Sequence, residues 1–250
     1  MMKGIAIFAL ACVLAVPAGL AQDNGQLQSA VQRALNSSRF RDVHVAVQGN
    51  DVTLTGTVGV YEAKLQADKK ARHVHGVAAV DDEIQVAGPE IPDQELQSKL
   101  INSVTYGLLG YVPVQFQTIM IGVHNGVVYV SGHAAGPIAA TDAMSIIDNT
   151  KGVKGVVDHL KVDPLSTIDF QLRMRVYHAV YSSPFLFNYA INPSKPVRIQ
   201  VENEHVTLYG VVDTETQKEV AGIKANSVPG VLSVTNDIQV LHPSNEKPSK

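Results

Sequence analysis

The sequence predicts an α+β fold made of three tandem modules, each with the element order helix, strand, strand, helix, strand. The first observation is a repeat: two glycines lie 20 residues apart in three segments, and a valine follows the second glycine by 10 residues. The second is a helical apolar pattern ahead of each first glycine, and the third is a pair of alternating apolar segments joined by a tight turn. A fixed internal period is typical of repeated structural units. The paired glycines are Gly56 and Gly76, Gly132 and Gly152, and Gly210 and Gly230.

Composition excludes several classes of protein. The chain has 250 residues, of which 45% are apolar and 17% charged, so it has enough apolar residues for a packed core and is not globally disordered. Its 20 Lys and Arg residues are balanced by 23 Asp and Glu residues, so the chain lacks the excess of positive charge that is typical of nucleic-acid-binding proteins. Cys12 is the only cysteine, so a disulfide framework and a cysteine-cluster metal site are both excluded.

The N-terminus is predicted to be an export signal. A positive start precedes an apolar run, and the small residues Gly19 and Ala21 then favour cleavage between Ala21 and Gln22, which places the mature chain in the periplasm, free or membrane-associated. An uncleaved anchor is the weaker alternative, because the run of 13 residues is short of the roughly 20 that a span needs. Lipidation of Cys12 stays an open alternative, since the two residues before it loosely resemble a lipobox. We expect no transmembrane span in the mature chain.

Each module is expected to begin with an amphipathic helix followed by a β-hairpin. The apolar spacing of the helices is i, i+4 and i+7 or i+8, which places those residues along one helix face. The turns between the hairpin strands carry Asn and Gly, the residues that tight turns favour. The helix residues are Leu27, Val31, Ala34 and Leu35; Leu96, Leu100 and Val104; and Leu172, Val176 and Val180. The hairpin strands are Val43–Val47 and Val52–Leu54, Ile119–Val123 and Val128–Val130, and Val197–Val201 and Val206–Leu208.

The second half of each module is expected to hold a helix and a last strand. The first repeat glycine is interpreted as the end of the hairpin, and the second as a helix stop. A small residue 11 positions after the first glycine, namely Ala67, Ala143 or Ala221, would let the second helix lie close to the sheet. Both helices then cover one face of a three-stranded sheet. The predicted boundaries are 1–21 for the signal peptide, 22–87, 94–163 and 167–241 for the modules, and 242–250 for a disordered tail.

The repeated motif resembles the BON domain. The resemblance rests on VTLTGTV and HGVAAVDDEIQV within Val52–Val86, and on VTLYGVV and PGVLSVTNDIQV within Val206–Val240. It covers nearly the whole mature chain in three copies, and the second copy departs most from the pattern. The resemblance implies an exported, non-enzymatic module of the kind found in osmotically inducible periplasmic proteins. It also implies an association with phospholipid membranes and envelope maintenance, and it supplies no catalytic or cofactor-binding residue.

The sequence gives only weak support for a catalytic, metal or cofactor site. Neither a phosphate-binding glycine loop, a nucleophile elbow nor an HExxH motif occurs in the sequence. His73 and His75 lie close in sequence, but an i, i+2 pair at a helix end points to different faces, which disfavours a zinc site. A catalytic triad of Ser131 and His133 with Asp142 or Asp148 is likewise disfavoured. We therefore expect no enzyme activity, metal or cofactor.

Two sets of residues are candidates for binding. The first is the basic set Lys64, Lys69, Lys70 and Arg72 on the second helix of the first module. The second is an aromatic set beside two arginines in the third module, and it comprises Phe185, Leu186, Phe187 and Tyr189 with Arg173 and Arg175. Each set has an ordinary structural alternative, namely a solvated helix face for the first and core packing for the second.

Two functions compete on this evidence. The first is binding of anionic phospholipid or an envelope membrane surface in support of envelope integrity or the stress response. The second is a periplasmic scaffold or chaperone-like binder of envelope proteins. The apolar stretch Leu108–Val112, which lengthens the second copy, is expected to pack between modules.

Overall fold

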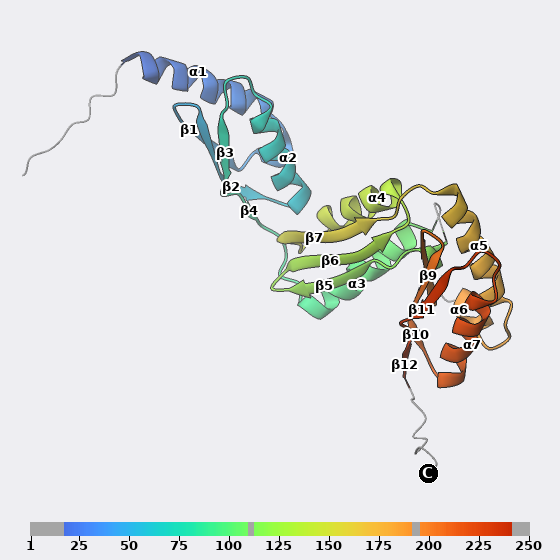
Figure 1. The fold of residues 1–250 in the computed structure, drawn as a ribbon. Helices are drawn as coiled ribbons and strands as arrows, with labels where there is room; N and C mark the ends of the chain where they lie inside the picture. The colour runs from blue at the N-terminus through green and yellow to red at the C-terminus, as the bar shows by residue number, and fades with distance from the viewer. Residues whose placement is uncertain (1–17, 110–112, 192–195, 242–250) are drawn as a thin grey trace, which may run out of the picture. The chain divides into compact units, whose positions relative to one another are not determined.

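A computed structural model of the chain describes residues 18–109, 113–191 and 196–241 (Figure 1). The first 17 residues of the predicted signal peptide, including Cys12, and the predicted tail 242–250 lie outside the described residues. The helix α1, Ala18–Ala34, begins before the predicted cleavage position. Of the stretch expected to pack between modules, Leu108 and Leu109 are described and residues 110–112 are not.

The predicted α+β fold with three αββαβ modules is confirmed. Backbone contacts divide the chain into two compact units, the first of which holds most of module one while the second holds modules two and three. Module one consists of α1, β1 (Val43–Gln48), β2 (Asp51–Val58), α2 (Tyr61–Arg72), β3 (Ala79–Asp82) and β4 (Gln85–Val86). Module two consists of α3 (Asp93–Gly107), β5 (Met120–His124), β6 (Val127–Ala134), α4 (Pro137–Asp148) and β7 (Gly155–Val162). Module three consists of α5 (Thr167–Tyr181), α6 (Phe187–Ile191), β8 (Arg198–Glu202), β9 (His205–Tyr209), β10 (Val211–Val212), α7 (Glu215–Asn226), β11 (Ser233–Asn236) and β12 (Gln239–Val240).

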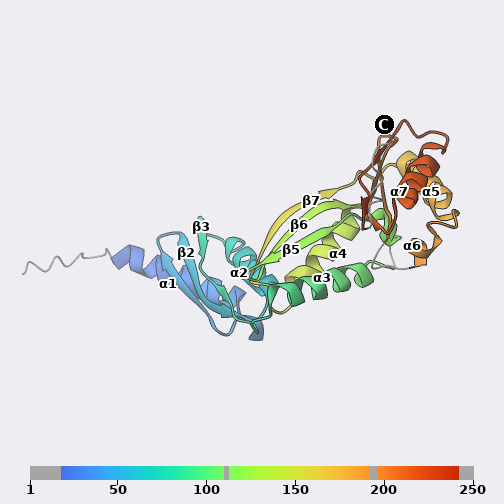
Figure 2. The same ribbon diagram turned by 90° about the horizontal axis from the view of Figure 1, so that it is seen from below.

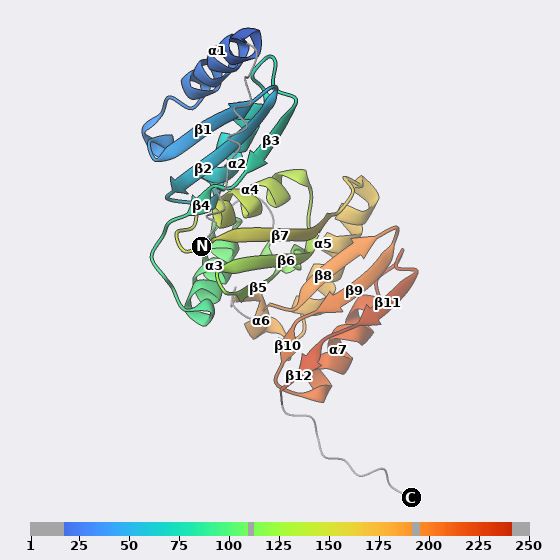
Figure 3. The same cartoon turned by 90° about the vertical axis from the view of Figure 1, so that its left-hand side faces the viewer.

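The second hairpin strand is the centre of each sheet. The strand β2 pairs antiparallel with β1 and parallel with β3, and the orders β5-β6-β7 and β8-β9-β11 repeat this arrangement. A parallel pair needs a crossover connection, and the second helix supplies it. Figure 2 shows α3 and α4 on one face of the β5–β6–β7 sheet, and Figure 3 shows β8, β9 and β11 side by side.

Most of the predicted core positions are buried, although Leu27 and Ala34 on α1 are only half-buried. Leu96, Leu100 and Leu172 on the first helices have no exposed surface, and the three alanines of the second helices are equally buried. Because Ala has no side chain beyond Cβ, each second helix can lie close to its sheet. The apolar helix stripe and the small residue together account for the helix layer of each module.

The first repeat glycines of modules one and two do not end the second hairpin strand as predicted, whereas β9 of module three does end before Gly210. Gly56 and Gly132 lie inside β2 and β6, which continue for two residues beyond them, whereas Gly210 separates β9 from β10. All three have positive φ, and a Cβ atom on Gly56 or Gly132 would lie 2.0 Å from a carbonyl oxygen of the neighbouring strand segment. Gly56 and Gly132 are therefore required by backbone conformation and close approach rather than by the end of a strand.

The last strand also departs from the prediction in two modules. It is continuous in module two as β7, but it is split into β3 and β4 in module one and into β11 and β12 in module three. At each split an Asx side chain accepts a hydrogen bond from a backbone N–H two residues later, as Asp82 does from Ile84 at 3.0 Å. The equivalent Asp158 of module two accepts the same bond from Leu160 at 2.8 Å within the continuous β7, so this bond alone does not split the strand.

An aspartate on the first helix fixes the hairpin turn in modules two and three. The Asp93 carboxylate accepts from the backbone N–H groups of Asn125 and Gly126 at 2.7 and 2.9 Å. Asp169 accepts in the same way from Asn203 and Glu204 at 3.1 and 2.9 Å. These backbone hydrogen bonds lower the pKa of Asp93. They hold turns in which Asn125, Asn203 and Glu204 have positive φ, a conformation that costs energy for residues other than glycine.

Candidate functional site

The predicted basic set on α2 divides into two bound and two exposed side chains. The Lys64 ammonium donates to the Ile84 carbonyl oxygen at 2.7 Å and lies 3.7 Å from the Asp82 carboxylate. Arg72 pairs with Asp68 at 2.7 Å and donates to the Val80 carbonyl oxygen at 3.0 Å. These two residues therefore tie α2 to the last strand of module one.

Lys69 and Lys70 remain exposed near the C-terminal end of α2. A helix C-terminus carries partial negative charge, so cations there are stabilised by the helix as well as free to meet an anionic partner. They are the part of the predicted basic set that the structure leaves available for binding.

The predicted aromatic set contains buried anchors and exposed rings in alternation. Leu186 is completely buried and Tyr189 is 7% exposed, so both belong to the core of module three and not to a contact surface. The Tyr189 hydroxyl donates to Asp213 and accepts from the Asp213 backbone N–H, both at 3.0 Å. Phe185 and Phe187, by contrast, are 58% and 57% exposed.

The two predicted arginines of module three lie in different surroundings. Arg175 is exposed and lies beside Gly230, which follows the C-terminal end of α7. The Phe185 carbonyl oxygen instead accepts from Gln217, near the start of α7. The structure therefore does not bring Arg175 and the exposed rings together. Arg173 is only 5% exposed, so its prediction as a surface contact is corrected to an interior role.

Arg173 occupies a position that has the same function in all three modules. The residue after the first core-facing leucine of each first helix donates to a carbonyl oxygen of the first strand. Gln28 donates to Val45 at 2.8 Å, Gln97 to Ile121 at 2.8 Å, and Arg173 to Val201 at 3.0 Å. The longer arginine makes this helix-to-strand contact and still has donors left for a second partner.

The second partner is Asp163, which lies in the connection between modules two and three. The Arg173 guanidinium and the Asp163 carboxylate are 2.9 Å apart, and Asp163 is 3% exposed. Burial lowers the pKa of Arg173, and the nearby Asp163 carboxylate opposes that shift. An ion pair with an additional hydrogen-bond partner is the arrangement that a buried charge requires.

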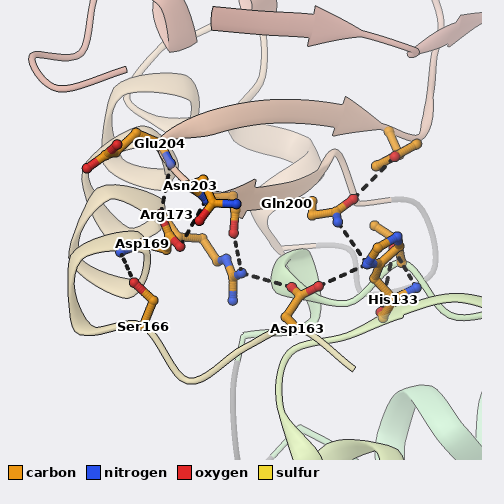
Figure 4. A network of polar contacts seen from close by, with 11 residues as sticks. His133, Asp163, Ser166, Asp169, Arg173, Gln200, Asn203 and Glu204 are labelled. Carbon is orange, nitrogen blue, oxygen red and sulfur yellow. Dashed lines mark hydrogen bonds and ion pairs between the residues drawn. The ribbon is translucent and has the colours of Figure 1, made fainter. Parts of the chain in front are cut away.

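Asp163 also reaches back to module two through His133 on β6 (Figure 4). The Asp163 carboxylate lies 2.9 Å from His133 Nδ1, which is also 2.8 Å from the side-chain amide of Gln200 on β8. Beside them, the Arg198 guanidinium donates to the backbone carbonyl of Gln117. Polar contacts from both hairpins and from the connecting segment therefore join modules two and three.

An aromatic cluster accompanies this polar network. Phe116, from the end of the segment that lengthens module two, is 1% exposed. Its ring packs edge-on against Phe170 and Tyr177 of α5, with centroid distances of 6.5 and 5.9 Å. The Arg173 guanidinium lies 5.6 Å from the centroid of the Phe116 ring, a cation–π distance. The inserted segment thus packs between modules at Phe116, several residues later than the apolar stretch identified in the sequence.

A groove of about 570 Å³ lies between the sheets of modules two and three. From module two it is lined by Thr118, Ile119, Met120, Ser131, Gly132, His133, His159 and Lys161. From module three it is lined by Arg198, Tyr209, Gly210, Val211, Asp237 and Gln239. Three of these residues, His133, Arg198 and Tyr209, also take part in the polar contacts at the junction, so the groove opens beside it.

The histidines and acidic residues form no metal cluster within the described part of the chain. His133 pairs with Asp163 and not with the Asp142 or Asp148 considered from the sequence. Across residues 18–109, 113–191 and 196–241, none of the helices has the length and apolarity that crossing a bilayer requires.

Comparison with known proteins identifies a family for the repeated module. The model of the BON domain matches residues 23–88, 93–164 and 183–242. Osmotically-inducible protein Y of Escherichia coli (strain K12) is 23% identical over 201 residues, which cover 75% of this chain and 92% of that protein. The "Uncharacterized protein in gshII 5'region" of Anaplasma centrale is 26% identical over 125 residues, which cover 49% of this chain and 83% of that protein.

Among solved structures, a similar chain is CdsD, a structural protein of the type III secretion system of Chlamydia trachomatis. It is 16% identical, with 88% of this chain and 94% of that chain covered, and the TM-score is 0.24. The three matches of the BON model span most of the sequence, and each falls on one copy of the glycine repeat. The chain belongs to the BON domain family.

Proposed function

We propose that this chain is an exported, non-enzymatic protein that binds the surface of anionic phospholipid membranes in the cell envelope. The observation that carries the proposal is the exposure of Phe185 and Phe187 on a segment that Leu186 and Tyr189 anchor in the core. An apolar group that is held rigidly above the protein surface can enter a membrane interface without an ordering cost of its own.

The exposed rings supply the apolar part of binding. Ile191, at the end of α6, is 67% exposed and extends the same segment. Complete burial of a Phe side chain contributes roughly 1.5–3 kcal/mol, so covering the exposed half of each ring contributes about 1–1.5 kcal/mol. Two rings therefore account for about 2–3 kcal/mol of membrane affinity.

The exposed lysines of α2 supply the electrostatic part. Lys69 and Lys70 would each contribute about 1 kcal/mol near an anionic surface. Their contribution is screened by salt, because both side chains are in contact with solvent. The proposal therefore includes a salt-sensitive component from module one and a salt-insensitive component from module three.

The proposal also includes a location in the periplasm and a role under osmotic stress. The predicted signal peptide supports a periplasmic location, and the likeness to Osmotically-inducible protein Y supports a role under osmotic stress. We place the chain at the membrane surfaces that face the periplasm, where it supports envelope integrity.

Flotation of the exported chain with phosphatidylglycerol vesicles and with phosphatidylcholine vesicles tests the proposal. We expect binding to the anionic vesicles, and at least a tenfold loss on Phe185→Ser with Phe187→Ser. Lys69→Glu with Lys70→Glu should cause a similar loss at low salt and little loss at high salt. As a matched control, Ile138→Ser changes an apolar side chain on α4 that is 66% exposed, and it should leave binding unchanged.

The same experiment separates membrane binding from protein scaffolding. Vesicle binding that is absent, or that neither double variant alters, contradicts the membrane proposal. Loss of envelope-protein capture by the aromatic variant without any vesicle binding would instead favour the scaffold.

A further inference from the structure

The groove between modules two and three has the properties of a ligand site, and it is independent of the exposed rings and of the lysines on α2. One wall is the sheet face of module two that its helices leave uncovered. Met120, Ser131 and His159 form one cross-strand row on this face, and His133 pairs with Lys161 two positions along the strands. Ile121 and Val130, which point the opposite way because side chains alternate along a strand, belong to the core.

The opposite wall comes from module three and is held in place. Tyr209 and Val211 line it on either side of Gly210. The Tyr209 hydroxyl donates to Gln200 at 3.2 Å, and Gln200 contacts His133 of the first wall. Arg198, on the same wall, donates to the Gln117 backbone carbonyl of module two. The network that joins the modules therefore also fixes the width of the groove, so the site exists before a ligand arrives.

The lining combines apolar surface with an excess of positive charge. Ile119, Met120 and Val211 provide the apolar surface, and Met120 is 60% exposed. Lys161 and Arg198 provide two cationic side chains, against the single carboxylate of Asp237. His133 and His159 add imidazole groups that can donate hydrogen bonds to an anion. Such a surface complements a molecule with one anionic group and an apolar body.

The size of the groove sets the class of ligand. Its volume of about 570 Å³ lies within the range of small-molecule sites, which are mostly apolar with a few placed polar groups. We propose that this inter-module groove binds a small monocarboxylate with an aliphatic chain. The carboxylate lies toward Lys161 and His159, and the chain lies against Met120 and Val211. The carboxylate of Asp237 disfavours a ligand with a second negative charge.

Calorimetric titration of the exported chain with octanoate tests this proposal. We expect saturable binding with one octanoate for each chain. Octyltrimethylammonium, which has a chain of equal length and the opposite charge, should bind at least tenfold more weakly. Lys161→Glu and Met120→Glu should each weaken octanoate binding at least tenfold, and both positions are exposed enough that the fold tolerates the change.

Two control variants locate the binding. Lys151→Glu changes an exposed lysine of module two outside the groove, and it should leave the octanoate affinity within twofold. Phe185→Ser with Phe187→Ser should do the same, since those rings do not line the groove. The proposal is overturned by the absence of saturable binding, by equal binding of the two amphiphiles, or by affinity that is insensitive to both groove variants. Loss of binding in the aromatic variant would also overturn it, whether or not that variant binds vesicles.

Discussion

The substitution Arg173→Gln tests the role of the inter-module ion pair while preserving the architecture of the module. Glutamine is the residue that modules one and two have at this position, where it bonds the first helix to the first strand. The variant therefore retains that helix-to-strand bond. It removes the guanidinium from Asp163 and from the face of the Phe116 ring.

The expected cost follows from the surroundings of the pair. Removing one partner of a buried ion pair typically costs about 3–5 kcal/mol, because the other charge stays buried without compensation. Here Asp163 keeps His133 as a partner, which reduces the cost. The variant also removes a desolvated guanidinium whose Nε has no hydrogen-bond partner in the described structure. We therefore expect a loss of about 2 kcal/mol in the free energy of unfolding of the second unit, or roughly 4–8 °C in Tm.

Urea unfolding followed by circular dichroism measures this loss, and Arg175→Gln provides the matched control. Arg175 lies two residues away on α5 and is exposed, so its substitution should change stability by less than about 0.5 kcal/mol. A double-mutant cycle with Asp163→Asn isolates the pair from other effects of each change. If Arg173→Gln costs no more than Arg175→Gln, or if the two changes in the cycle are additive, the ion pair does not join the modules.

Three further predictions concern the interior of the modules. Burial is the main cause that raises the pKa of Asp148 to about 6, so the folded state binds its proton more tightly than the unfolded state does. The contribution of Asp148 to stability should then be greatest below pH 4 and fall by at most about 3 kcal/mol as the pH rises through 6, and Asp148→Asn should abolish this fall in urea titrations across pH. Gly132→Ala should cost about 3 kcal/mol or more in thermal unfolding because its Cβ would collide with the Thr118 carbonyl oxygen, whereas Gly25→Ala, in open space on α1, should be neutral or stabilising. Leu186→Ala should cost about 2–5 kcal/mol and Phe185→Ala under about 1, and equal costs would show that Phe185 is also core.

The sequence predicts the interior of each module well, because the spacing of apolar residues along one helix or strand indicates which of its side chains are buried. Leu96, Leu100 and Val104 follow the helical period, and all three are buried. The role of the repeat glycines is harder to predict, because a glycine at a strand end and a glycine at a close backbone approach look the same in a sequence. Only the positive φ and the neighbouring carbonyl of Gly132 distinguish them.

The residues that make contacts between modules follow almost no periodic pattern in the sequence. Arg173 is interpreted from the sequence as a surface cation, since arginine is rarely buried and its partner lies in a linker. Phe116 belongs to an insertion that has no counterpart in module one, so no repeat pattern describes it. The role of Arg173 could be found by comparing equivalent positions of the three modules, because modules one and two have Gln28 and Gln97 where module three has Arg173. A longer, charged side chain that becomes buried at a position otherwise held by a half-buried hydrogen-bond donor needs an additional partner.

The departures of modules two and three from the common pattern are concentrated at their junction. The insertion brings Phe116 to α5, the arginine at the shared helix position reaches Asp163, and Gln200 reaches His133. In a tandem array with short linkers, each module can otherwise keep its own orientation, because interfaces between domains are small and polar. These residues do not improve the core of either module, since the same core positions are filled without them in module one. What they stabilise is a fixed arrangement of two sheets, and the groove is the feature of the second unit that depends on that arrangement.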